Sequence, residues 1–333
     1  MSVAHPIARH CLAALLVVAA SAQADPLAEM AAFSAFKGMS LEKLAAGSVK
    51  AARGPTMSFP RGLAVESCYI VRKPLAKTVE LHQQWTPAKH PELKVYLHGD
   101  LPARPSLSDF SKLASAPGNA AVKSFLSATQ KLSAGNSALQ MSNAEAKAFT
   151  GDTNAFWGNL LHQRAQAFLS GGLARLPAYE TGGESIRAAD EVARLLKDAG
   201  KVSAQFSGII GATPLGGGKG ALTASPYWEM VDVEGEAAVT LGASYSKAAA
   251  NGAQSVEIQY YASTEFYVLV TLQQMWPVTL DGRDATLVWR GDLISAESLA
   301  KLRGVEKMGS STAMMRETQK SIEALLGDIA KAP

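Results

Sequence analysis

The segment Glu265-Phe-Tyr-Val-Leu-Val-Thr-Leu-Gln-Gln-Met-Trp276 reads as a long β-strand near the end of the chain. Side chains alternate between the two faces of a strand, and an antiparallel strand open to water has one plainly polar face. Both faces of this segment are largely apolar, so the pattern predicts a strand that is covered on both sides. Two arrangements fit: helices packed on both faces, or helices on one face and a mixed ligand cavity on the other.

Further strands are expected on both sides of this segment, because short runs there alternate or are rich in β-branched and aromatic residues. In chain order they are Leu63–Val71, Leu93–His98, Tyr227–Val233, Ala238–Tyr245, Ser255–Ala262 and Ala285–Arg290. Asp281-Gly282, which precedes the last of these strands, predicts a hairpin turn.

Helical periodicity dominates elsewhere. Between about residues 105 and 210 the chain is rich in Ala, Ser and Gly, and Ser142-Asn-Ala-Glu145 forms a capping box. Residues 304–329 predict a long C-terminal helix with Met315 on its apolar stripe. The predicted fold class is therefore α+β. We expect one domain over residues 25–333, with a curved antiparallel sheet, a long C-terminal helix and a helical insertion at about 105–210.

The first 24 residues have the pattern of an export signal. Arg9 and His10 precede a short apolar run, and Ala22-Gln23-Ala24 supplies a small-x-small cleavage site. The apolar run is too short to span a membrane, which takes about 20 residues. We therefore predict a signal peptide over residues 1–24, cleavage after Ala24, no transmembrane span in the mature chain, and a periplasmic or secreted location.

Composition and motifs exclude several functions. A net charge of +3 over the whole chain, without clustered Lys and Arg, argues against a nucleic-acid partner. Cys11 would be removed with the signal peptide, so Cys68 would have no cysteine to pair with. We predict that Cys68 is a small buried apolar residue. His82, His90 and His98 recur at eight-residue spacing, which is not a zinc pattern. No nucleophile elbow, phosphate loop or calcium loop is present, so we predict no catalytic residue, cofactor or metal ligand.

The order of elements resembles the helix-grip layout of START-related lipid-binding proteins, in which a curved sheet wraps a long terminal helix around a cavity. Residues 41–329 resemble more closely a set of exported bacterial proteins that have no assigned function. The residues that carry this likeness are Leu44-Ala-Ala-Gly47, Tyr227-Trp228, Tyr260-Tyr-Ala-Ser263 and Leu287-Val-Trp-Arg290. The resemblance implies a cavity-forming fold and brings no catalytic residues with it.

A cavity between sheet and helix would draw its lining from the last strands and the terminal helix. The candidate ligand-binding residues are Glu257, Tyr261, Glu265, Tyr267, Thr271, Gln273, Trp276, Trp289, Arg290 and Met315. Tryptophans at element ends are candidates for a pocket mouth, and Arg290 is a candidate clamp for an anionic head group, although salt-bridged arginines are more common.

Three functions remain open from the sequence. The first is binding of an apolar or amphipathic small molecule, including a lipid, with affinity from buried apolar area. The second is an enzyme in the same cavity, with Glu265 or Glu257 as general base and Tyr261 or Tyr267 as proton donor. The third is a non-catalytic protein that docks an envelope partner through its Ala- and Ser-rich helical block.

Overall fold

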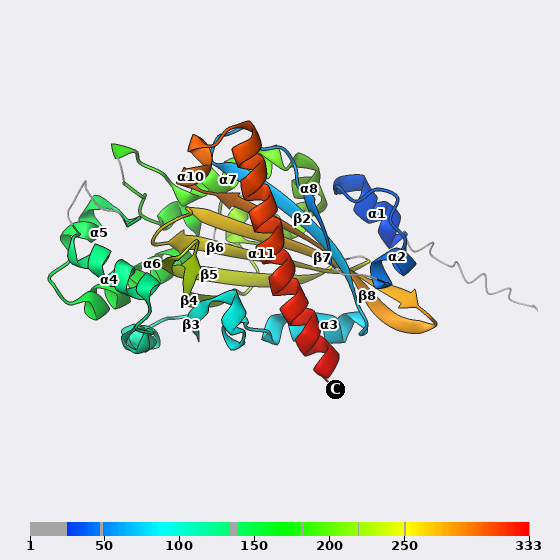
Figure 1. The fold of residues 1–333 in the computed structure, drawn as a ribbon, viewed down its shortest axis with the longest axis horizontal. Helices are drawn as coiled ribbons and strands as arrows, with labels where there is room; N and C mark the ends of the chain where they lie inside the picture. The colour runs from blue at the N-terminus through cyan, green and yellow to red at the C-terminus, as the bar shows by residue number, and fades with distance from the viewer. Residues whose placement is uncertain are drawn as a thin grey trace, which may run out of the picture.

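The computed structural model describes residues 25–46, 49–132, 139–180, 183–218, 220–249 and 251–332. The predicted signal peptide and Gly47 of the resemblance lie outside these described residues. The fold is α+β, with one eight-stranded sheet and a long C-terminal helix across it (Figure 1). This confirms the fold class predicted from the sequence.

The sheet has the strand order β1-β2-β8-β7-β6-β5-β4-β3, and every neighbouring pair is antiparallel. Its strands are β1 (Lys50–Arg53), β2 (Gly62–Val71), β3 (Val95–Asp100), β4 (Ser225–Val233), β5 (Glu236–Ala249), β6 (Gly252–Ala262), β7 (Val268–Leu280) and β8 (Arg283–Ser295). Asp281 and Gly282 join β7 to β8 with φ angles of 52° and 70°, the left-handed geometry of a tight hairpin. The strand predicted from Glu265 instead begins at Val268, because Glu265 has a φ of 70° and lies in a bend.

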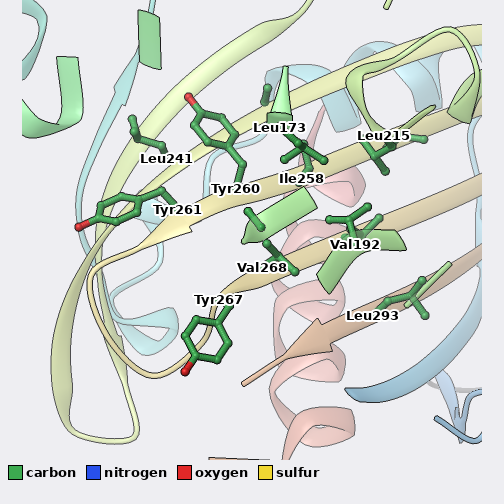
Figure 2. Packing of buried hydrophobic residues seen from close by; sticks show 14 of the residues in the cluster. Leu173, Val192, Leu215, Leu241, Ile258, Tyr260, Tyr261, Tyr267, Val268 and Leu293 are labelled. Carbon is green, nitrogen blue, oxygen red and sulfur yellow. The ribbon is translucent and has the colours of Figure 1, made fainter. Parts of the chain in front are cut away.

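One face of the sheet, here called the helical face, is formed on β7 by Val268, Val270 and Leu272 and is packed by helices. Figure 2 shows part of this core, with Val192 and Leu173 beside Ile258 and Tyr260. Among the described residues, the helices before β4, apart from three given below, are α1 (Pro26–Phe33), α2 (Leu41–Ala45), η3 (Leu107–Ser115), α4 (Ala120–Gln130), α5 (Asn143–Lys147), α6 (Thr153–Gly171), η4 (Leu173–Arg175), α7 (Ala188–Asp198), α8 (Gly200–Gln205), α9 (Ser207–Ile210) and η6 (Pro214–Gly216). The helices of the predicted insertion share one hydrophobic core with the sheet.

The opposite face, here called the cavity face, is formed on β7 by Leu269, Thr271, Gln273 and Met275. Helix α11 (Gly304–Lys331) crosses it diagonally, and α3 (Leu75–Gln84) lies beside the far end of α11 (Figure 1). The other short helices in the described ranges are η1 (Pro87–Lys89), η2 (Pro91–Leu93) and α10 (Glu297–Lys301). Strand β7 is therefore covered on both faces. Several helices pack against its helical face, whereas α11 crosses its cavity face.

Candidate functional site

A cavity of about 800 Å³ lies between the cavity face and α11. It exists because α11 is anchored at two separated places. Ile322, Leu325 and Ile329 pack with Tyr69, Met275 and Val288 near its C-terminal end, whereas Met314 packs on a second cluster around Leu63, Phe266 and Leu299. Between these anchors α11 presents the polar residues Glu317, Lys320 and Ser321 to the cavity, and before Met314 it presents the small residues Ser310 and Ala313. These side chains do not fill the space beneath the helix.

The floor of the cavity is a polar belt across the middle of the sheet. Strand register places Ser244, Glu257, Thr271 and Asp292 side by side on β5, β6, β7 and β8. The next row of the same face contains Ser246, Ser255, Gln273 and Arg290. Apolar residues form much of the remaining wall, and they include Leu63, Val79, Phe266, Leu269, Met275, Ile294, Leu299, Met314, Ile322 and Leu325. The cavity is therefore amphipathic.

Arg290 is held by Asp292, which lies two residues away on the same strand face. Its Nε donates to both Asp292 carboxylate oxygens at 3.0 and 2.9 Å, and one terminal nitrogen donates to Oδ1 at 2.8 Å. Thr271 donates to the same Oδ1 at 2.7 Å. The Asp292 carboxylate raises the pKa of Arg290 despite its burial, so the guanidinium stays charged. Arg290 therefore has an internal counterion.

Glu257 has no such counterion. The Tyr227 hydroxyl donates to Glu257 Oε1, although Tyr227 lies on β4 and Glu257 on β6. No Lys, Arg or His forms an ion pair with Glu257 within the part of the chain that the structure describes. Burial raises the pKa of Glu257 above its ordinary value, while the Tyr227 hydrogen bond and the charge of Arg290 oppose this shift.

Two histidines border the belt, and their surroundings shift their pKa values in opposite directions. His98 contacts Glu229 through Nδ1 at 2.9 Å and Asp100 through Nε2 at 3.2 Å. Both ring nitrogens face carboxylates, and the Glu229 hydrogen bond raises the pKa of His98, which favours the doubly protonated ring. His82 is neutral, because burial lowers its pKa to about 4. Its Nδ1 donates to the Thr78 carbonyl and its Nε2 accepts from Tyr69.

The structure brings five of the ten candidate residues to this cavity. Glu257, Glu265, Thr271, Gln273 and Arg290 line it. The sequence made Arg290 a candidate clamp for an anionic head group. An anionic ligand would have to compete with Asp292, which already accepts hydrogen bonds from two of the Arg290 nitrogens.

The other five candidates lie elsewhere. A β-bulge at Tyr260 shifts the register of β6, so Tyr261 joins the core of the helical face (Figure 2). There it stacks with Tyr179, and the Arg164 guanidinium lies over its ring. Trp276 and Trp289 lie on that same face near Phe33. Half-buried Met315 does not line the cavity, whereas its neighbour Met314 does.

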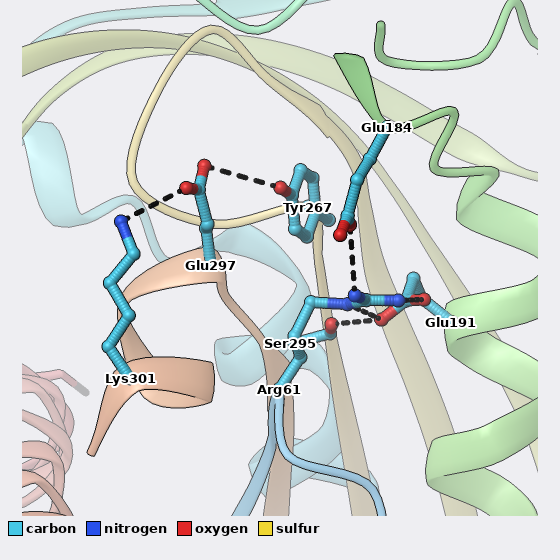
Figure 3. Close-up of polar contacts among 7 residues, drawn as sticks. All are labelled: Arg61, Glu184, Glu191, Tyr267, Ser295, Glu297 and Lys301. Carbon is cyan, nitrogen blue, oxygen red and sulfur yellow. Dashed lines mark hydrogen bonds and ion pairs between the residues drawn. The ribbon is translucent and has the colours of Figure 1, made fainter. Parts of the chain in front are cut away.

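Tyr267 belongs to a separate polar cluster at the end of the sheet (Figure 3). Its hydroxyl lies 3.5 Å from Glu297, which also pairs with Lys301. Beside it, Arg61 bridges Glu184 and the buried Glu191, and Ser295 donates to Glu191. Neither Tyr261 nor Tyr267 therefore meets Glu257.

The polar groups of the belt and its border that sequence reasoning missed include Tyr227, Glu229, His98 and Asp292. The alternation of Tyr227 and Glu229 along β4 was a usable signal, since both point to the face opposite Trp228 and Met230. Nothing in the sequence places Tyr227 beside Glu257, because the two strands are not neighbours.

Comparisons with known proteins give little further information. No family model and no curated protein matches the chain. A solved structure described as a START superfamily protein from Mycobacterium smegmatis matches with 16% sequence identity and a TM-score of 0.24. The match covers 31% of this chain and 66% of that chain, just under two thirds of its length. In the described ranges, no helix combines the length and apolarity needed to cross a membrane, and no three His, Cys, Asp or Glu side chains are grouped to hold a metal ion.

Proposed function

We propose that this protein binds an amphipathic small molecule in the cavity beneath α11. The observation that carries the proposal is the cavity itself, whose volume of about 800 Å³ lies within the range of small-molecule sites. Its apolar walls would supply affinity, at roughly 0.8 kcal/mol for each buried methylene group. The polar belt would orient the polar end of the ligand, as convergent polar groups do in such sites.

The alternatives have weaker support. The enzyme hypothesis paired a glutamate with Tyr261 or Tyr267, and both tyrosines lie away from the cavity lining. The envelope-partner hypothesis looked for an exposed apolar stripe on residues 152–170, but α6 buries Phe156, Trp157, Leu160, Leu161 and Phe168. Export to the periplasm or beyond remains part of the proposal and rests on the N-terminal sequence alone.

The test is a bulky substitution in the cavity. Ser244 is half-buried on the lining, so Ser244→Trp should occupy the space beside Glu257. The matched control is Arg283→Trp, which introduces the same side chain at an exposed residue beside the β7–β8 turn. Binding is followed with N-phenylnaphthylamine, a neutral probe that becomes fluorescent in apolar surroundings.

We expect saturable binding by the wild type and by Arg283→Trp, and affinity at least about tenfold weaker for Ser244→Trp. Circular dichroism checks that both variants are folded. Equal binding by a folded Ser244→Trp protein, or no binding by the wild type, would overturn the proposal.

A further inference from the structure

We propose that the ligand of this cavity carries a cationic, ammonium-type head group that pairs with Glu257. This inference rests on the proposed function, because it specifies the polar end of the molecule that the cavity binds. It is drawn from the charges of the lining and from the way those charges are paired.

The charged lining is strongly acidic. Among the described residues it contains eight carboxylates against three Lys or Arg side chains. The acids are Glu92, Asp100, Glu229, Asp232, Glu234, Glu257, Glu265 and Glu317, and the bases are Lys94, Lys320 and Arg290. A cavity lined predominantly by one sign of charge concentrates ligands of the opposite sign, because its low-dielectric walls focus the field.

Pairing within the floor isolates Glu257. The charge of Asp292 is balanced by Arg290, and that of Glu229 by His98. Glu257 forms no ion pair among the described residues: its hydrogen bond comes from the neutral Tyr227 hydroxyl, and the Arg290 charge that acts on it is already paired with Asp292. A buried carboxylate without a directly paired cation is costly, and a ligand ammonium group beside Glu257 would supply that pairing.

An anionic head group fits the same floor poorly. It would approach Arg290 only through the terminal nitrogen that Asp292 does not hold, with the carboxylates of Asp292 and Glu257 nearby. Like-charge contacts in a desolvated site are unfavourable. A neutral alcohol would donate a hydrogen bond to Glu257 but would not balance its charge.

The experiment compares three amphipaths with the same alkyl chain and different heads: dodecylamine, dodecanol and dodecanoate. Each competes with the neutral probe N-phenylnaphthylamine below its aggregation threshold at neutral pH, where the amine is protonated. We expect the wild type to bind dodecylamine at least about tenfold more tightly than dodecanol, and dodecanoate most weakly.

Two variants connect the preference to Glu257. Glu257→Gln keeps the shape and the hydrogen bond from Tyr227, so it should bind dodecanol as the wild type does but lose the preference for the amine. Glu317→Gln is the matched control, because Glu317 is an exposed lining residue of α11 whose charge is screened by water. Glu317→Gln should keep most of the preference for dodecylamine over dodecanol.

The outcomes separate the two proposals. If none of the three compounds competes, the proposed function fails. If they compete with equal strength or dodecanoate binds best, the cavity function stands and the cationic head group is wrong. If Glu257→Gln keeps the full preference for dodecylamine, Glu257 is not its partner and the inference is overturned.

Discussion

The phenol ring of Tyr227 on β4 lies across the intervening strand β5, and its hydroxyl donates to the carboxylate of Glu257 on β6. Gly242 makes this contact possible, since it is the residue of β5 directly beside Tyr227. A Cβ atom at Gly242 would lie 2.3 Å from Cζ of Tyr227 and 2.4 Å from its hydroxyl oxygen. The hydrogen bond between Tyr227 and the Glu257 carboxylate thus depends on the absence of a side chain at Gly242, on the strand between them.

Gly242→Ala should therefore displace the Tyr227 ring. The added methyl group overlaps the ring, and overpacking of this kind costs about 1–3 kcal/mol of unfolding free energy. Denaturant unfolding measures the loss in the wild type and in a Tyr227→Leu background. The cost should shrink when the ring is absent, and an unchanged cost in both backgrounds would show that the methyl group clashes with something else.

Glu257→Gln should stabilise the protein at neutral pH. Burial raises the pKa of Glu257 in the folded state above its unfolded value, so the folded protein binds the proton more tightly. The stability of the wild type then falls as pH rises from the ordinary glutamate pKa through the raised one, and the loss is complete above that window. Below the window the carboxyl is protonated in both states, so the penalty vanishes.

The variant lacks this penalty, and above the window it should be more stable than the wild type by about 0.5–2 kcal/mol. Thermal unfolding of both proteins across the acidic to neutral range measures the difference. A variant less stable than the wild type at neutral pH would contradict the prediction. Glu317→Gln, exposed on α11, should follow the wild-type pH profile.

Arg164 and Glu145 form a buried ion pair, and loss of Glu145 should destabilise the protein more than loss of Arg164. Arg164 donates to the Glu145 carboxylate at 2.7 and 2.6 Å, and its side chain is 1% exposed against 12% for Glu145. Glu145→Gln leaves a buried guanidinium without its counterion, which costs about 3–5 kcal/mol. Arg164→Met should cost less, because the Glu145 carboxylate reaches water. The reverse order in denaturant unfolding would refute this account.

Cys68 should be unreactive while the protein is folded. It is fully buried on the helical face of β2, and burial raises the pKa of its thiol to about 12. Because the thiolate is the reactive form, iodoacetamide at mildly alkaline pH should leave Cys68 unmodified until denaturant is added. Peptide mass mapping locates the label, and rapid modification of the native protein would mean that the thiol is accessible.

Much of the architecture could be predicted from local pattern. The alternation of residues in β4 to β7, the Asp281-Gly282 turn and the periodicity of α11 are properties of short segments, and the structure confirms these elements. Four of the candidate site residues, Glu257, Thr271, Gln273 and Arg290, line the cavity for the same reason: they occupy positions on one face of adjacent strands. Tyr261 was misplaced because a single bulge reverses the alternation beyond it.

The sequence by itself determined which segments become strands and helices, and that the central strands are covered on both faces. Only the tertiary structure decided which face encloses a cavity, that Asp292 neutralises Arg290, and that Tyr227 reaches Glu257. The physical reason is that periodicity is a local property of the chain, whereas a cavity and an ion pair depend on register between strands and on the space left between packed elements.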